Sequence, residues 1–132
     1  MTTSTGAEAS PAEMAKAALR LLDEGEPRDV LAQLDPTAMR TLLAVAQGAS
    51  SLEEIELVLQ YQQARFKRWH PNTAKVLIDL LRWATRDVRG DDERADRRRA
   101  EFAAQQLGLI ARAHKVIAAQ TGRGGGARGV FQ

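Results

Sequence analysis

The sequence predicts an all-α, single-domain bundle of five or six helices with a long C-terminal helix. The chain has 132 residues, of which 44% are hydrophobic and 27% charged, as expected for one small globular domain. Apolar residues recur at steps of three and four, and Ser, Asp, Pro and Gly stand where helices begin and end. No stretch of useful length alternates apolar and polar residues, so we expect no strand.

Capping residues divide the first 48 positions into three short helices. Residues 10–13, Ser-Pro-Ala-Glu, combine a capping box with a proline at the first helical position. Gly25 ends the first helix and Pro27 begins the second. Asp35, followed by proline, is the expected N-cap of the third helix, which ends at Gly48.

Two longer helices are predicted in the middle of the chain. Residues 51–54, Ser-Leu-Glu-Glu, form a second capping box, and apolar residues recur behind it as far as Trp69. Pro71 ends that helix or begins the next one, which is expected to run to about Arg89.

The last helix is expected to be the longest. Acidic residues 91–93 favour a helix start, and a continuous helix from there to Gln120 would measure roughly 40 Å. Gly108 interrupts it, which predicts either a close crossing with another helix or a break into two pieces. Its expected apolar face is Phe102, Leu109, Ala113, Val116 and Ile117, with Gln106 in register.

The expected domain organisation is simple. We expect residues 1–9 to be a disordered lead-in, residues 10–120 to form the bundle, and residues 121–132 to be a flexible tail rich in Gly and Arg. The predicted core consists of Leu21, Leu31, Leu42, Leu52, Ile55, Leu59, Phe66, Leu77, Leu80, Leu81, Phe102, Leu109 and Ile117.

Several classes of function find no support in the sequence. The chain has no cysteine, and His70 and His114 fall in different predicted elements without a metal-ligand spacing. The serines stand at helix starts or in the lead-in, where capping explains them. We therefore expect no enzyme, no catalytic residue, no cofactor, no metal and no small-molecule substrate. No run of 18 apolar residues and no secretory signal is present, so we expect a cytoplasmic protein without a membrane partner.

Charge is distributed unevenly along the chain. Residues 1–64 hold 4 Lys or Arg against 10 Asp or Glu, a net charge of −6, whereas residues 65–132 hold 15 against 7, a net charge of +8. Either the second half meets a polyanion, or acidic and basic halves meet within or between subunits.

Four basic segments are the candidate binding residues. The first interleaves cations with aromatics, a composition suited to phosphate contacts beside stacked bases, although its aromatics equally continue an apolar face. The second can follow a phosphate backbone or pair with the acidic half, the third lies where apolar residues are few, and the last resembles RGG-type segments. The candidates are Arg65, Lys67, Arg68, Trp69; Lys75, Arg82, Arg86, Arg89; Arg94, Arg97, Arg98, Arg99; and Arg123, Arg128.

The function that we predict is that of a non-enzymatic small helical subunit. We expect it to bind nucleic acid, DNA or RNA, through its basic second half, within an oligomer or a larger nucleoprotein complex. The alternative is a protein-protein interaction or adaptor domain without nucleic acid, in which a protein partner or self-association saturates the arginines.

Overall fold

The computed structural model describes residues 9–125, and side chains as far as residue 121. These residues form six helices and no strand, which confirms the all-α bundle. No helix within the described residues is long and apolar enough to cross a membrane. The helices are α1 (Pro11–Arg20), α2 (Glu26–Gln33), α3 (Pro36–Gly48), α4 (Leu52–Arg65), α5 (Thr73–Thr85) and α6 (Glu93–Gly125).

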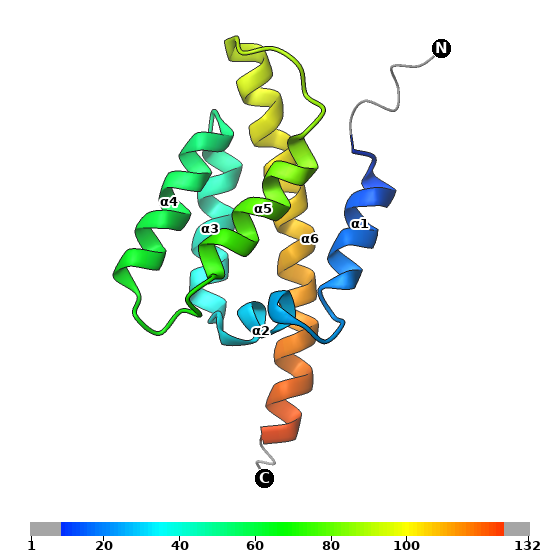
Figure 1. Ribbon diagram of the computed structural model, residues 1–132, viewed down its shortest axis with the longest axis vertical. Coiled ribbons are helices and arrows are strands. Elements are labelled where there is room, and N and C mark those ends of the chain that lie inside the picture. The colour runs from blue at the N-terminus through cyan, green and yellow to red at the C-terminus, as the bar shows by residue number, and fades with distance from the viewer. Residues whose placement is uncertain (1–8, 126–132) are drawn as a thin grey trace.

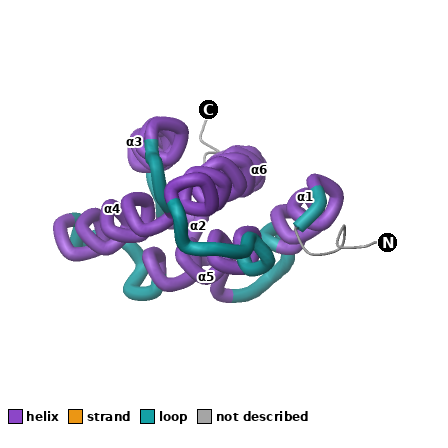
Figure 2. Tube along the Cα trace, turned by 90° about the horizontal axis from the view of Figure 1, so that it is seen from above, coloured by secondary structure: helices purple, strands orange, loops and turns teal. Residues whose placement is uncertain are grey.

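Helix α6 is the axis on which the others pack. It contacts each of α1 to α5. Helix α1 lies on one side of it and α3 and α4 on the other, while α5 crosses in front (Figure 1). Seen from above, α1 and α4 are at opposite edges of the bundle (Figure 2). The long C-terminal helix is thus the element that holds the fold together.

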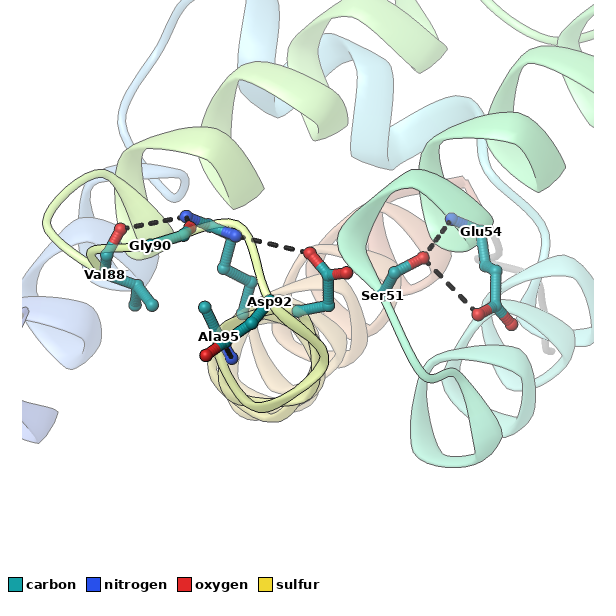
Figure 3. Close-up of polar contacts among 8 residues, drawn as sticks. Ser51, Glu54, Val88, Gly90, Asp92 and Ala95 are labelled. Carbon is teal, nitrogen blue, oxygen red and sulfur yellow. Dashed lines mark hydrogen bonds and ion pairs between the residues drawn. The ribbon is translucent and has the colours of Figure 1, made fainter.

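The caps predicted from the sequence are present. Ser10 Oγ accepts a hydrogen bond from the Glu13 amide at 3.1 Å, and the Glu13 carboxylate accepts one from the Ser10 amide at 3.0 Å. Asp35 accepts from the Ala38 amide at 2.7 Å. Ser51 Oγ accepts from the Glu54 amide (Figure 3), but the Glu54 carboxylate accepts from the Ser50 amide rather than from that of Ser51, so the second predicted capping box is incomplete. Each cap satisfies an amide that the first turn of a helix leaves without a partner.

Most of the predicted core is buried, with four exceptions. Leu80, Phe102 and Leu109 are only partly buried, and Phe66 is 39% exposed. In α6 the buried face is instead centred on residues that the sequence analysis did not choose, namely Ala103, Leu107 and Ile110, each with an exposed fraction of 0%. The predicted residues that are buried are Leu21, Leu31, Leu42, Leu52, Ile55, Leu59, Leu77, Leu81 and Ile117.

Several helix ends differ from the sequence prediction. Helix α4 ends at Arg65 rather than at Trp69, and α5 begins at Thr73 and ends at Thr85 rather than near Arg89. Helix α6 continues to Gly125, past the end expected at Gln120. Leaving the helix at Arg65 allows the chain to turn and bury the Trp69 indole, which a straight helix would carry past the bundle.

Gly108 is neither a crossing point nor a break. Helix α6 is continuous through it, and a Cβ placed on this residue would have no atom within 4 Å. The expected break is wrong because the helix is continuous. The expected close crossing is wrong because the glycine lies beside open space.

We expect Gly108→Ala to stabilise the protein by about 1 kcal/mol, the helix-propensity difference between the two residues. Chemical denaturation followed by circular dichroism measures it. Gly90→Ala is the opposite control, since Gly90 has φ +96°, where a Cβ is strained. A loss of stability in Gly108→Ala would show that the surroundings of this position are crowded.

Candidate nucleic-acid interface

The predicted basic residues occupy three separate places. One group lies at the end of α4 and in the loop that follows, a second along α5 and just after it, and a third at the start of α6. The α4–α5 loop and the start of α6 are at opposite ends of the bundle (Figure 1). Helix α5, which carries the second group, runs between these two ends, so what each group can offer a ligand depends on the charge that it leaves unpaired.

Two cations of α5 are paired within the chain. The Lys75 ammonium lies 3.0 Å from the Asp79 carboxylate, one turn later. The Arg82 guanidinium donates two hydrogen bonds to the Glu56 carboxylate of α4, at 2.8 and 2.9 Å. These bonds and the charge of Glu56 raise the pKa of Arg82 above its usual value. Both cations are therefore already paired with carboxylates. One of these carboxylates, that of Glu56, lies in the acidic first half of the chain.

Arg86 is also engaged, at the end of α5. Its guanidinium lies 4.7 Å from the centre of the Trp83 ring and donates to the Trp83 carbonyl at 2.8 Å. It is 3.3 Å from the Asp87 carboxylate and 4.0 Å from that of Glu13 in α1. In the loop that follows, Arg89 is exposed and has no ion pair with any described residue.

At the start of α6, Arg99 serves the fold. Its guanidinium donates to the carbonyl oxygens of Val88 and Gly90 and lies 3.4 Å from the Asp96 carboxylate (Figure 3). This side chain therefore closes the α5–α6 loop onto the first turns of α6. Arg98 lies over the Phe102 ring, 5.2 Å from its centre.

Arg94 and Arg97 are exposed, but their surroundings are neutral overall. Neither makes an ion pair with a described residue, and the Arg97–Glu101 pair that the spacing allows is not formed. Residues 86–101 carry six Arg and six Asp or Glu, so the segment has no net charge. Long-range attraction of a polyanion to this end of the molecule is correspondingly weak.

The loop after α4 has the strongest uncompensated charge. Residues 57–78 contain no Asp or Glu and four Lys or Arg. Three of these cations, Arg65, Lys67 and Arg68, are exposed and close together in the chain, and none makes an ion pair with a described residue. This is the part of the sequence-predicted set in which neighbouring cations are exposed and no nearby acid in the chain offsets their charge.

The loop is held in one conformation by its own side chains. Trp69 is 6% exposed and belongs to the main core cluster, and its amide donates to the Phe66 carbonyl at 3.1 Å. The Gln63 side chain donates to the His70 carbonyl at 3.1 Å and accepts from the Ala74 amide at 2.8 Å. Both sides of the Gln63 amide thus fix the loop between the ends of α4 and α5.

Trp69 is therefore buried, whereas its neighbours in the sequence-predicted set are exposed. Its indole lies in the core, as the packing alternative proposed. The exposed aromatics beside the cations are Phe66, 39% exposed, and Tyr61, 56% exposed. Arg65 links the two, since its guanidinium lies 5.4 Å from the Phe66 ring centre and donates to the Tyr61 hydroxyl at 3.4 Å.

We call the exposed set Tyr61, Arg65, Phe66, Lys67 and Arg68 the basic surface. Sequence analysis missed Tyr61, although its position four residues before Arg65 places it on the same side of α4. The basic surface combines cations for phosphate with aromatic rings on which bases stack.

The remaining candidates add little to this picture. The Arg123 side chain and all of Arg128 lie outside the described residues. His114 is buried, with Nε2 2.5 Å from the Leu34 carbonyl oxygen, and His70 Nδ1 accepts from the Asn72 amide. In the described part of the chain, no three His, Asp or Glu residues are grouped to hold a metal ion. Comparisons with protein-family models, with curated proteins and with solved structures found no match to this chain.

Proposed function

We propose that this protein is a non-enzymatic subunit that binds nucleic acid through the basic surface. The observation that carries the proposal is the co-location of three unpaired, exposed cations and two exposed aromatic rings in a 22-residue stretch without an acid. Arginine and lysine neutralise phosphates, and aromatic rings stack on bases whatever their identity. We therefore expect binding with little sequence preference.

The fixed conformation of the loop supports the proposal. A flexible loop loses conformational freedom when it binds, and that loss subtracts from affinity. Here Trp69 and Gln63 hold the loop before any ligand arrives, through core packing and two hydrogen bonds. The neighbouring Arg82 and Lys75 leave less charge for a ligand, since each already has a carboxylate partner.

The test compares two charge reversals of equal size. We expect Lys67→Glu with Arg68→Glu to weaken binding of a labelled single-stranded oligonucleotide at least about tenfold, because phosphate contacts become repulsive. Fluorescence anisotropy at two salt concentrations measures the affinity and its salt dependence.

The matched control is Arg94→Glu with Arg97→Glu, which changes the net charge by the same amount at the neutral end of the bundle. We expect it to bind within about threefold of the parent protein, since its surroundings carry no net charge. Equal losses in the two variants would assign binding to overall charge rather than to the basic surface. Absence of binding at low salt would contradict the proposal.

A second candidate function is a protein interaction domain, favoured by an apolar groove between α1 and α6. Leu19 of α1 is 63% exposed and Val116 of α6 is 41% exposed, and both line this groove with Leu22, Leu109 and Ala113. Exposed apolar patches of this kind occur at protein interfaces. Retention of a protein partner by the parent chain but not by a Leu19→Asp variant would support it.

A further inference from the structure

Helix α4 is apolar on two opposite faces. Leu52, Ile55 and Leu59 are buried against the bundle, as expected for a helix at its edge. On the other side, Leu57 is 71% exposed and Tyr61 is 56% exposed. Helix α4 lies at the margin of the molecule in both views, with no other helix outside it (Figures 1 and 2). Leu57 and Tyr61 therefore contribute little to the core and are exposed to solvent.

Opposite charges stand at the two ends of this exposed face. Glu53 is in the first turn of α4 and Arg65 in the last, and both are exposed. Together with Leu57 and Tyr61 they recur every four residues, a spacing that forms one stripe along a helix. We call these four residues, Glu53, Leu57, Tyr61 and Arg65, the outer face of α4. Its order from the N-terminus is acid, two apolar side chains, base.

Neither the acid nor the base of the stripe forms an ion pair with a described residue, although Glu53 is close enough to Arg82 to help raise its pKa. Glu53 makes no ion pair or hydrogen bond with a described side chain, whereas Glu54 beside it accepts from Ser50 and Ser51. Arg65 makes no ion pair with a described residue and contacts the Tyr61 hydroxyl at 3.4 Å.

This order of residues is complementary to itself when reversed. Glu53 and Arg65 are equally far from Leu59 along the helix, as are Leu57 and Tyr61. If a second copy of α4 lies antiparallel on the first, about a two-fold axis that passes between Leu57 and Tyr61 on the outer face, each Glu53 faces an Arg65 and each Leu57 faces a Tyr61. Two-fold contacts bring the same surface of both copies together and so require this property.

We propose that the outer face of α4 binds the outer face of α4 in a second copy of this chain, in an antiparallel dimer. The contact goes beyond nucleic-acid binding and does not depend on it. It employs Arg65 and leaves Lys67 and Arg68 available for phosphate. The basic surface would then occur twice, once at each end of the helix pair, which extends the site for a nucleic-acid strand.

The expected dimer is weak, because the interface is small. A helix of 14 residues is about 21 Å long and about 10 Å wide, so one helix face buries a few hundred Å² per copy. Stable interfaces bury about 800 Å² per partner. We therefore expect association only at high micromolar concentration or above, weakened by salt because two ion pairs contribute.

The decisive test uses two charge reversals, alone and mixed, on the full chain without nucleic acid. Sedimentation equilibrium is expected to show a monomer–dimer equilibrium for the parent protein. Glu53→Lys alone and Arg65→Glu alone each place like charges together twice in a dimer, so each is expected to weaken association at least about tenfold. An equimolar mixture of the two variants restores both attractive pairs, and we expect it to form a one-to-one dimer.

An apolar variant tests the centre of the face. Leu57→Asp is expected to abolish the dimer, whereas the matched substitution Leu19→Asp, at a position of α1 that is 63% exposed, is expected to leave it intact. Lys67→Glu with Arg68→Glu is expected to retain the dimer even if nucleic-acid binding fails, which separates the two proposals.

Three results would overturn the dimer. Even a weak contact is populated at about 1 mM, so a parent protein that is still monomeric at this concentration would exclude the dimer. Variants that associate as strongly as the parent show that the contact lies elsewhere. A mixture that fails to pair, or assembly that continues beyond two copies, excludes the antiparallel arrangement.

Discussion

Replacing Trp69 with alanine is expected to lower the free energy of unfolding by about 3–5 kcal/mol. Trp69 is 6% exposed and packs in the main core cluster, so its removal loses buried apolar contacts and leaves a cavity. Small domains have a total stability of about 5–15 kcal/mol, so the variant keeps little margin. Urea unfolding followed by far-ultraviolet circular dichroism measures the change.

Phe66→Ala is the matched control, three residues earlier in the same loop. The Phe66 ring is 39% exposed and belongs to the basic surface, so we expect its removal to cost less than about 1 kcal/mol of stability while weakening nucleic-acid binding. The two aromatics would thus separate folding from binding. If Trp69→Ala unfolds at the urea concentration of the parent protein yet loses binding, the indole has the ligand role that its sequence neighbours suggested.

The fold class was predictable because its signals are local. A capping hydroxyl, a following proline and a Glu three residues later act within one turn, and Ser10 and Glu13 make both bonds of the capping box. Asp35 caps α3 in the same way. No distant partner is needed for such signals, so the sequence alone located these helix starts.

The buried face of α6 was not predictable in the same way. Of the predicted face, Ala113 and Ile117 are buried, whereas Phe102, Leu109 and Val116 are not. Ala103, Leu107 and Ile110, which were not predicted, also recur with helical spacing and are buried. Periodicity identifies a helix, but when apolar residues cover more than one face it does not choose between them. Contact with the other helices makes the choice, and here α6 contacts all five of them.

The sequence predicted what kind of residues form the candidate site, but not which of the cations are available to a ligand. Runs of Lys and Arg are visible in the sequence, but whether a cation is available depends on acids that are distant in the chain. Arg82 pairs with Glu56, 26 residues away, and Arg99 bonds backbone carbonyls of the preceding loop. Three cations within residues 65–68, inside a stretch from 57 to 78 without an acid, were the signal that could have ranked the loop first.

Ile110→Ala tests this assignment of the buried face and is expected to destabilise the protein by about 2–5 kcal/mol. Ile110 has an exposed fraction of 0% and lies in the main core cluster, at a level of α6 where neighbouring helices surround it. Removal of three carbon atoms from a packed site loses their transfer free energy and leaves a cavity. Thermal or urea unfolding of the full chain measures the loss.

Val116→Ala is the control, because Val116 belongs to the face that the sequence favoured and is 41% exposed. Its removal is expected to cost less than about 1 kcal/mol, since a half-exposed methyl pair loses little contact. A larger loss in Val116→Ala than in Ile110→Ala would mean that α6 is rotated relative to the bundle. The groove beside α1 would then be part of the core, and the neutral start of α6 would present a different set of arginines to solvent.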